Sequence, residues 1–239
     1  MADQHQLKKA AAEWAAAMIE DGMVVGLGTG STASLILEPL AARIRQGLRM
    51  VGIPTSERTA EQARALGIPL STFSDHGRAD HAPVDLTIDG ADEVELGTLN
   101  LIKGRGGALL REKIVASASA RLVIVADESK LVERLGRGAL PVEVVPFEWQ
   151  STARRIESLG ASATLRLRPD GGAFVTEGGH YIVDCAFGPI PSAGSLDREL
   201  NGIVGVVEHG LFLGLTDQVC VGRAAGVEVL ARSRTDQRA

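Results

Sequence analysis

Short apolar runs alternate with helical patterns along the first 139 residues. The apolar runs lie at 23–28, 49–56, 84–89 and 121–129, and helical spacing of apolar positions marks residues 8–20, 31–47 and 57–67. Strands that alternate with helices predict βαβ units and a parallel sheet. Ligands bind such sheets at the carboxyl ends of strands, where the first glycine loop, Ser56, Asp89 and Asp127 fall.

A different rhythm begins near residue 140. Expected strands at 141–147, 162–168 and 203–210, and an expected hairpin at 173–187 that is broken at residues 178–179, are separated by helical patterns at 148–160 and 192–202. This order is typical of the split βαβ, or ferredoxin-like, arrangement. The predicted fold is α/β, with a Rossmann-like parallel-sheet domain at 1–139 plus 209–239. A smaller ferredoxin-like α+β domain, residues 140–208, is inserted near the C-terminus.

The composition narrows the possible classes of function. Aromatic residues are only 3% of the chain and the net charge is −5 with no basic block, so base stacking and phosphodiester binding are disfavoured. Two cysteines do not make a disulfide framework or a thiol metal site. No convincing secretory signal or membrane-spanning run is found. The sequence predicts a cytoplasmic protein with no nucleic-acid or membrane partner.

The first candidate loop is GLGTGSTA, residues 26–33. Its spacing departs from a dinucleotide fingerprint because Ser31 stands at the third glycine position, and no GK[ST] of a P-loop follows. The hydroxyls of Thr29, Ser31 and Thr32 fall where a helix begins. Exposed N–H groups and the helix dipole bind a small anion at such a place. A tight turn with hydroxyl capping explains the pattern equally well.

The second loop, IDGADEVE at 88–95, holds four carboxylates in seven residues. Asp89 ends a strand, Gly90 allows a sharp turn, and Asp92 follows closely enough for both acids to face one cleft. Carboxylates accept hydrogen bonds from vicinal hydroxyls, so a polyol ligand is one interpretation. A solvated Asp-Gly turn is the other, and Glu93 and Glu95 are expected to be merely solvated. The D-x-D-x-D-G pattern of a calcium loop is missing, whereas another divalent metal at these acids stays an open alternative.

The third loop, LIKGRGGALLREK at 101–113, places Lys103 beside glycines that open another helix. It is a second candidate oxyanion site, with an ammonium group next to it. Glu112 follows on this helix, and its neighbours three and four residues away are apolar. Partial desolvation would raise its pKa toward the range of a general base. From the spacing alone, a structural salt bridge is the more frequent role for such a glutamate.

The fourth loop is VADESKLVERLG, residues 125–136. Asp127, Glu128 and Ser129 predict a helix start, with Lys130 near its first turn. The helix dipole does not favour a cation there, so Lys130 is either an exposed residue or a phosphate partner. The five histidines are scattered, and no His-Asp-Ser arrangement or HExxH motif can be read.

Five segments in register carry a resemblance to a known family. GLGTGST, DGADE, KGRGGALLREK, VADESK and LPVEVVPF, in this order, look like ribose-5-phosphate isomerase of the A type. The match runs from KKAAAEWA near the start to GVVEHGLF near the end. It implies interconversion of ribose 5-phosphate and ribulose 5-phosphate in the pentose phosphate pathway, through a cis-enediolate and without metal or cofactor. It also implies a small sugar phosphate as partner and a homodimer, sometimes a tetramer.

The same resemblance implies roles for individual residues. The proton acceptor falls on Glu112, with Asp89, Asp92 and Lys103 as further catalytic residues. Substrate-binding positions fall on Thr29, Gly30, Ser31, Thr32, Gly90, Ala91, Gly104, Arg105, Gly106, Lys130 and Lys8. Arg105 departs from the common K-G-G-G loop, so it either adds a phosphate contact or points outward.

Two other classes of function compete with the isomerase. A sugar-phosphate hydrolase or deaminase on a related scaffold needs a water-activating Asp-His pair, which the sequence does not reveal. A non-catalytic sugar-phosphate sensor, such as the effector module of a transcription regulator, needs no base at position 112. A nicotinamide enzyme is disfavoured by the glycine spacing of the first loop.

Overall fold

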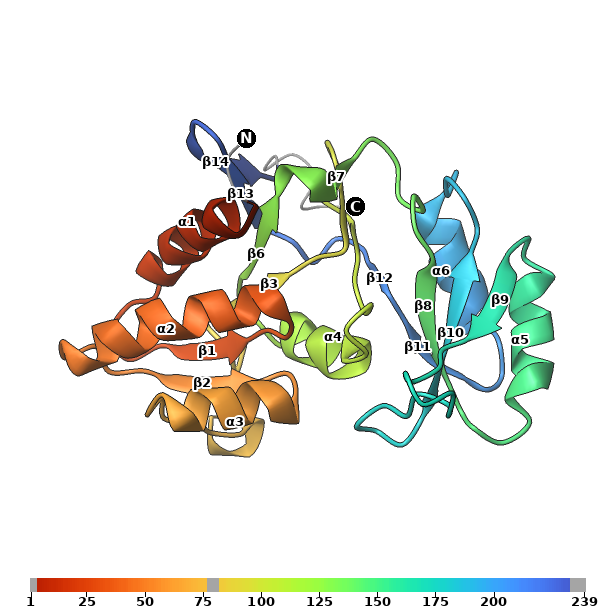
Figure 1. Ribbon diagram of the computed structural model, residues 1–239, viewed down its shortest axis with the longest axis horizontal. Helices are drawn as coiled ribbons and strands as arrows, with labels where there is room; N and C mark the ends of the chain where they lie inside the picture. The colour runs from red at the N-terminus through yellow and green to blue at the C-terminus, as the bar shows by residue number, and fades with distance from the viewer. Residues whose placement is uncertain (1–3, 77–81, 233–239) are drawn as a thin grey trace.

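The computed structural model describes residues 4–76 and 82–232. Within these ranges, a six-stranded sheet of order β14-β13-β6-β3-β1-β2 forms the larger part of the molecule (Figure 1). All neighbours are parallel except the β13–β14 hairpin. The strands are β1 Val24–Leu27, β2 Val51–Pro54, β3 Leu86–Gly90, β6 Leu122–Asp127, β13 Gln218–Arg223 and β14 Gly226–Ala231. The mostly parallel sheet predicted from the sequence is confirmed.

Helices cover both faces of this sheet. Val123 and Val125 of β6 belong to the core shared with α1 and α2, whereas Leu122 and Ile124 belong to the core that includes Ala116 of α4. Because successive side chains of a strand point to opposite faces, one continuous apolar run supplies both layers. The helices are α1 Gln4–Ala17, α2 Ser31–Arg45, α3 Glu57–Ala65 and α4 Leu109–Ser117, and η1 Phe73–Asp75 is a 3₁₀ turn.

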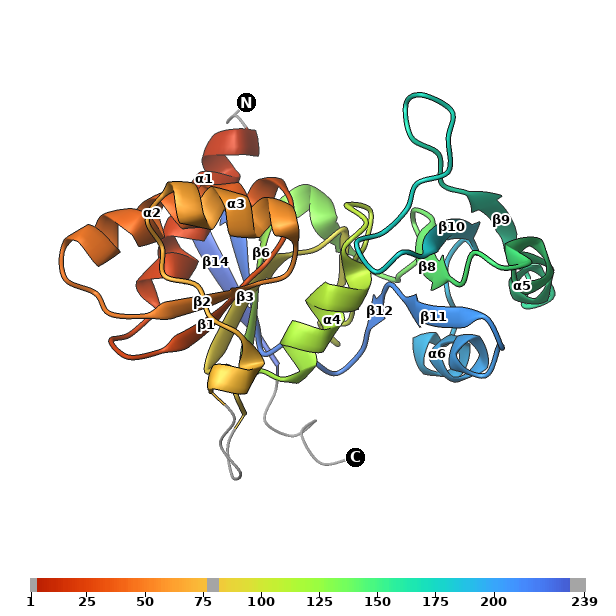
Figure 2. The same cartoon turned by 90° about the horizontal axis from the view of Figure 1, so that it is seen from below.

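A separate antiparallel sheet lies at the other end of the molecule, away from α1 and α2 (Figures 1 and 2). Its strand order is β11-β8-β10-β9, and α5 and α6 pack on it through Ile156 and Leu200. The elements are β8 Leu140–Val144, α5 Trp149–Glu157, β9 Ser162–Leu165, β10 Tyr181–Ala186, α6 Ala193–Asn201 and β11 Val206–His209. This β-α-β-β-α-β order matches the ferredoxin-like pattern. The extra hairpin strand expected before residues 178–179 is wrong, because only isolated bridges such as Val175 to Tyr181 form there. The domain limits at 140 and 208 stay a prediction.

A third sheet of very short strands, in the order β12-β5-β4-β7, was not expected from the sequence. Its strands are β4 Glu93–Glu95, β5 Leu101–Ile102, β7 Leu131–Val132 and β12 Leu211–Phe212. The helix expected to start at Asp127 is wrong: Glu128–Lys130 (η2) is one 3₁₀ turn, and the chain then enters β7. The pairing of β7 with β4 draws Lys130 toward the loop after β3. Among the described helices, none has the length and hydropathy to cross a membrane.

Candidate active site

A pocket of about 230 Å³ opens at the carboxyl ends of β1, β3 and β6. This is the edge of a parallel sheet at which ligand-binding loops gather. Glycine and alanine residues line the pocket together with charged side chains, so the pocket suits a small, strongly polar ligand. The lining residues are Lys8, Thr29, Gly30, Ser31, Gly90, Ala91, Asp92, Lys103, Gly104, Gly106, Glu112 and Lys130.

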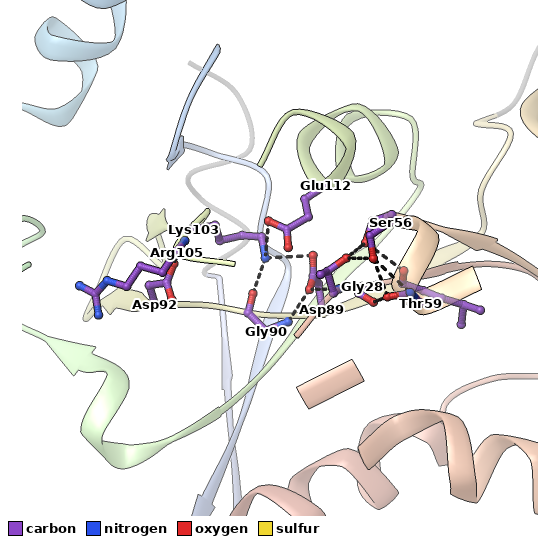
Figure 3. Close-up of polar contacts among 12 residues, drawn as sticks. Gly28, Ser56, Thr59, Asp89, Gly90, Asp92, Lys103, Arg105 and Glu112 are labelled. Atoms are coloured by element: carbon purple, nitrogen blue, oxygen red, sulfur yellow. Dashed lines mark hydrogen bonds and ion pairs between the residues drawn. The ribbon is translucent and has the colours of Figure 1, made fainter. Parts of the chain in front are cut away.

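Hydroxyl groups hold the glycine loop that follows β1 (Figure 3). Thr29 Oγ1 donates to Ser56 Oγ at 2.9 Å, and Thr59 Oγ1 donates to Gly28 O at 3.0 Å. Gly28 has no room for a side chain, because a Cβ there would lie 2.2 Å from Asp89 Oδ1. This close approach lets the Thr29 N–H donate to Asp89 Oδ1 at 3.1 Å. The loops after β1 and β3 are therefore locked together.

Lys103 forms the centre of a buried charge cluster (Figure 3). Its Nζ lies 2.9 Å from Asp89 Oδ2 and 3.3 Å from Glu112 Oε2, and it donates to Gly90 O at 2.6 Å. Burial alone would lower the pKa of Lys103, but the carboxylates of Asp89 and Glu112 outweigh it and hold this pKa above its ordinary value. The ammonium group is therefore charged at any physiological pH.

Glu112 lies on the buried face of α4, next to Leu109, Val115 and Ala116. Its side chain is only 5% exposed, and among the described residues Oε2 finds no hydrogen-bond donor. Burial raises the pKa of this carboxyl to about 8, although the Lys103 ammonium acts in the opposite direction. A carboxyl of this kind can both take and give a proton near neutral pH. Glu112 makes the salt bridge expected from the sequence, with Lys103, and it also lines the pocket.

The lysine–glycine loop, residues 103–107, turns at Gly104 with φ of 104°, a conformation that favours glycine. The Arg105 N–H donates to Asp92 Oδ2 at 2.9 Å. The Arg105 guanidinium instead reaches Glu93 Oε1 at 3.1 Å and extends away from Lys103 and Glu112 (Figure 3). Of the two possibilities left open by the sequence, the outward orientation is the one observed.

Two further lysines line the pocket. Lys8 Nζ, from α1, lies 3.2 Å from Asp127 Oδ2 at the end of β6. Although burial acts against it, hydrogen bonding from Ser129 and the Lys8 ammonium hold the pKa of Asp127 below its usual range. Lys130 has no carboxylate within ion-pair distance among residues 4–76 and 82–232. One lysine is thus partly neutralised, while the other keeps its charge for an anionic ligand.

The structure brings most of the sequence-predicted residues together. Asp89 lies just behind the pocket wall and reaches it through Lys103. Arg105 contributes its backbone near the pocket but not its guanidinium. Thr32 belongs to α2, and its side chain lies outside the described part. The other predicted positions all line the pocket.

Sequence reasoning missed Glu93, whose expected solvation is wrong. Its side chain is 0% exposed and accepts hydrogen bonds from the N–H groups of Gly136, Arg137 and Gly138 at 2.8, 3.2 and 2.6 Å. The hydroxyl cluster around Thr29 was also missed, although Ser56 falls at a strand end as expected. No local signal marks Glu93, because its three backbone N–H donors lie more than 40 residues away in the chain.

Groups of three or more His, Cys, Asp or Glu side chains able to hold a metal ion are not found within the described ranges. The cluster at Lys103 is instead organised around an ammonium group. An ammonium at this place can supply the positive charge that a developing anion requires.

Comparisons with known proteins agree with this geometry. The family described as ribose 5-phosphate isomerase A (phosphoriboisomerase A) matches residues 51–226. Ribose-5-phosphate isomerase A of Gloeobacter violaceus is 60% identical over 228 residues, covering 95% of this chain and 96% of the relative. The solved structure of ribose 5-phosphate isomerase A from Methanocaldococcus jannaschii superposes with a TM-score of 0.90 at 41% identity, covering 96% of this chain and 100% of that one.

Another solved structure is described as D-ribose-5-phosphate isomerase in complex with phospho-erythronic acid. It has a TM-score of 0.90 at 36% identity and covers 96% of this chain and 100% of that one. An α/β fold with a buried carboxyl in a pocket lined by lysines, together with these relatives, defines an aldose–ketose isomerase. The chain belongs to the ribose 5-phosphate isomerase A family.

Proposed function

We propose that this chain interconverts ribose 5-phosphate and ribulose 5-phosphate in the pocket around Lys103, and that Glu112 carries the proton. The reaction removes the proton from C2 of the open-chain aldose and returns it to C1 through a cis-enediolate. One buried base on one face of the sugar serves both steps. The observation that carries the proposal is the pocket-facing Glu112 carboxyl, whose pKa burial raises to about 8.

The phosphate group would lie where the pocket offers positive charge without competing acids. Lys130 lines the pocket without a carboxylate at ion-pair distance among the described residues, and Lys8 lines it as well, paired with Asp127. Residues 29–31 contribute the amino end of the fifteen-residue helix α2. Backbone N–H groups at a helix start and the helix dipole favour a bound anion. These groups support a position of the phosphate at one end of the pocket, which would leave the reacting carbons near Glu112.

The acidic residues have separate proposed roles. Asp92 lines the pocket and can accept hydrogen bonds from sugar hydroxyls, which also assists ring opening. Asp89 is buried and holds Lys103 through its Oδ2. Lys103 then faces the negative charge that develops on the oxygens of C1 and C2. A well-placed donor of this kind contributes about 3–4 kcal/mol to a transition state.

Glu112→Gln is the decisive variant. We expect kcat for ribose 5-phosphate to fall by about 10²–10⁴-fold, because a positioned general base contributes roughly this factor. The amide side chain of this variant resembles the protonated acid, so the affinity for the substrate's phosphate should change little. The measurement is a coupled assay together with calorimetric titration of phospho-erythronic acid, which carries a phosphate and a planar carboxylate.

Glu128→Gln is the matched control, because it removes an exposed carboxylate next to Lys130 without touching the Lys103 cluster. Its kcat should stay within about twofold of the unchanged chain, as for most surface substitutions. Near-normal turnover in Glu112→Gln would remove this residue from the proposed role. Binding of sugar phosphate with no turnover in the unchanged chain would favour the sensor instead.

The assembly, the compartment and the absence of a metal requirement stay predictions. The family resemblance supports a homodimer in the cytoplasm that works without metal. Light scattering on the purified chain tests the assembly. Turnover with and without EDTA tests the metal requirement, and a loss of activity that added divalent ions restore would contradict it.

A further inference from the structure

The guanidinium of Arg166 binds the backbone of the lysine–glycine loop. Arg166 belongs to the second sheet region, which is the antiparallel sheet β11-β8-β10-β9 with its connections. Arg166 directly follows β9, and its Nη1 donates to both Gly104 O and Arg105 O, at 3.0 Å each. Its side chain is 14% exposed. Two successive carbonyl oxygens of a loop that lines the pocket are therefore bound by a single residue about 60 positions away in the sequence.

The Arg166 guanidinium is itself firmly fixed. Its Nε donates to Asp184 Oδ2 at 2.9 Å, and its Nη2 donates to Asp184 Oδ1, so the pair is bidentate. The Phe174 ring lies 5.9 Å from Arg166 Cζ and packs on Gly107, where a Cβ would lie 2.4 Å from the ring. The segment between β9 and β10 thus contacts the lysine–glycine loop through both Arg166 and Phe174.

Because Arg166 fixes the two carbonyl oxygens, it also fixes the direction of the N–H group in each of the same peptide units. The peptide bonds are trans, so each N–H points opposite to the carbonyl of the same unit. The unit that carries Gly104 O places the Arg105 N–H on Asp92. The next unit carries Arg105 O and the Gly106 N–H. Within residues 4–76 and 82–232 this N–H has no acceptor, and Gly106 lines the pocket.

We propose that Arg166, fixed by Asp184, is a positioning residue for the isomerisation, because it orients the Gly106 N–H toward the oxyanion that forms on the substrate. The inference rests on the proposed function of the pocket. Arg166 touches no substrate and acts only through the loop. A preorganised N–H is effective because it needs no reorientation when charge develops. The second sheet region therefore contributes to catalysis without lining the pocket.

Arg166→Met tests the proposal, since it keeps an unbranched apolar side chain of similar length but releases both carbonyl oxygens. We expect kcat to fall by about a hundredfold, the usual cost of misplacing a catalytic group by about 1 Å. KM for ribose 5-phosphate should stay within about threefold, because the phosphate contacts are unchanged. Affinity for phospho-erythronic acid should fall with kcat/KM, whereas affinity for inorganic phosphate should not change.

Two further variants separate positioning from a general loss of structure. Asp184→Asn keeps the side-chain size but loosens the guanidinium, so a smaller fall in kcat of about tenfold is expected with the same ligand pattern. Arg168→Met is the matched control, because Arg168 lies two residues away in an exposed pair with Asp170. Its kinetics should equal those of the unchanged chain, as expected for an exposed pair.

The results distinguish this inference from the proposed function. The inference is overturned if Arg166→Met and Asp184→Asn both keep kcat and phospho-erythronic acid affinity within about twofold. It is also overturned if inorganic phosphate affinity falls as much as analogue affinity, because the whole pocket has then collapsed. An active Glu112→Gln would contradict the proposed function itself, whereas an inactive Glu112→Gln beside a normal Arg166→Met would contradict only the positioning role.

Discussion

Glu93 and Glu112 are both buried, and they contact different residues of the lysine–glycine loop, Arg105 and Lys103 respectively. Glu93 receives hydrogen bonds from three backbone N–H groups and from Arg105, so both of its oxygens are occupied. Glu112 Oε2 has only the Lys103 ammonium at 3.3 Å and, among the described residues, no hydrogen-bond donor. The two carboxyl groups share chemistry and burial but differ in how many partners the fold supplies.

Under the proposed function, this difference separates a structural carboxylate, Glu93, from the proposed proton carrier, Glu112. A carboxylate whose lone pairs are all used fixes the segments that donate to it, and at Glu93 these are the loops at 105 and 136–138. A buried carboxyl with an unused oxygen is costly to ionise, so its pKa rises and it exchanges a proton near neutral pH. Burial is nearly the same at these two glutamates, whereas the number of hydrogen-bond donors within reach differs.

Glu93→Gln should produce the largest effect on stability. The amide nitrogen would face backbone N–H donors, and the Arg105 guanidinium would lose its partner. Removing one member of such a buried network costs about 3–5 kcal/mol. Urea unfolding of the variant should show this loss in the free energy of unfolding, whereas kcat of the remaining folded protein should fall less than in Glu112→Gln.

Glu95→Gln is the control for this experiment. Glu95 lies two residues further along β4, is partly exposed and accepts from Thr98 Oγ1. Its loss should cost about 1 kcal/mol or less, as for other partly exposed hydrogen bonds. Equal stability of the two variants would mean that the four donors around Glu93 contribute nothing special, and the contrast with Glu112 would fail.

The sequence predicts where the pocket lies better than it predicts the hydrogen bonds and ion pairs around the pocket. Buried apolar runs marked β1, β3 and β6, and the carboxyl-end rule then brought residues 29–31, 90–92 and Lys130 to one edge. Helical spacing placed Glu112 on the buried face of α4. These predictions depend on local periodicity and on one general property of parallel sheets.

The remaining features depend on partners that are distant in sequence. The strands β4, β5 and β7 are two or three residues long, too short to carry a period, and they exist because they pair with one another. Glu93 contacts Gly136, 43 residues away, and Arg166 contacts Gly104, 62 residues away. No local pattern encodes such contacts. The same acidic sequence in a turn can therefore contain a solvated carboxylate or a buried carboxylate whose oxygens all accept hydrogen bonds.

The raised pKa of Glu112 predicts how activity and stability depend on pH. The base must be ionised in the uncomplexed enzyme, so kcat/KM should fall as pH drops below about 8, by about a hundredfold between pH 9 and pH 6. The folded-state pKa lies above the ordinary value of 4.5, so the proton is bound more tightly in the folded chain. The resulting stabilisation is complete below the ordinary pKa and is lost as pH rises through 8.

Thermal unfolding between pH 5 and pH 9 checks the second half of this prediction. The unchanged chain should lose stability relative to Glu112→Gln as pH rises, because the amide of the variant has no proton to lose. Glu128→Gln serves again as the comparison, since it leaves the Lys103 cluster intact. Parallel pH profiles for the unchanged chain and Glu112→Gln would show that Glu112 titrates at its ordinary pKa, like a solvated carboxyl.

The smallest effect is expected at Arg105, whose side chain is 42% exposed and adds the fourth donor to Glu93. Arg105→Met keeps the bulk of the side chain but removes one charged partner, and the three backbone N–H groups remain. A loss of about 0.2–1 kcal/mol is expected, as for other partly exposed ion pairs. Because the guanidinium extends away from the pocket, KM and kcat for ribose 5-phosphate should stay within about twofold. Urea unfolding and the coupled assay measure both quantities. A KM raised tenfold with unchanged kcat would mean that Arg105 turns inward and binds the phosphate, so Glu93 would then be saturated by the backbone alone.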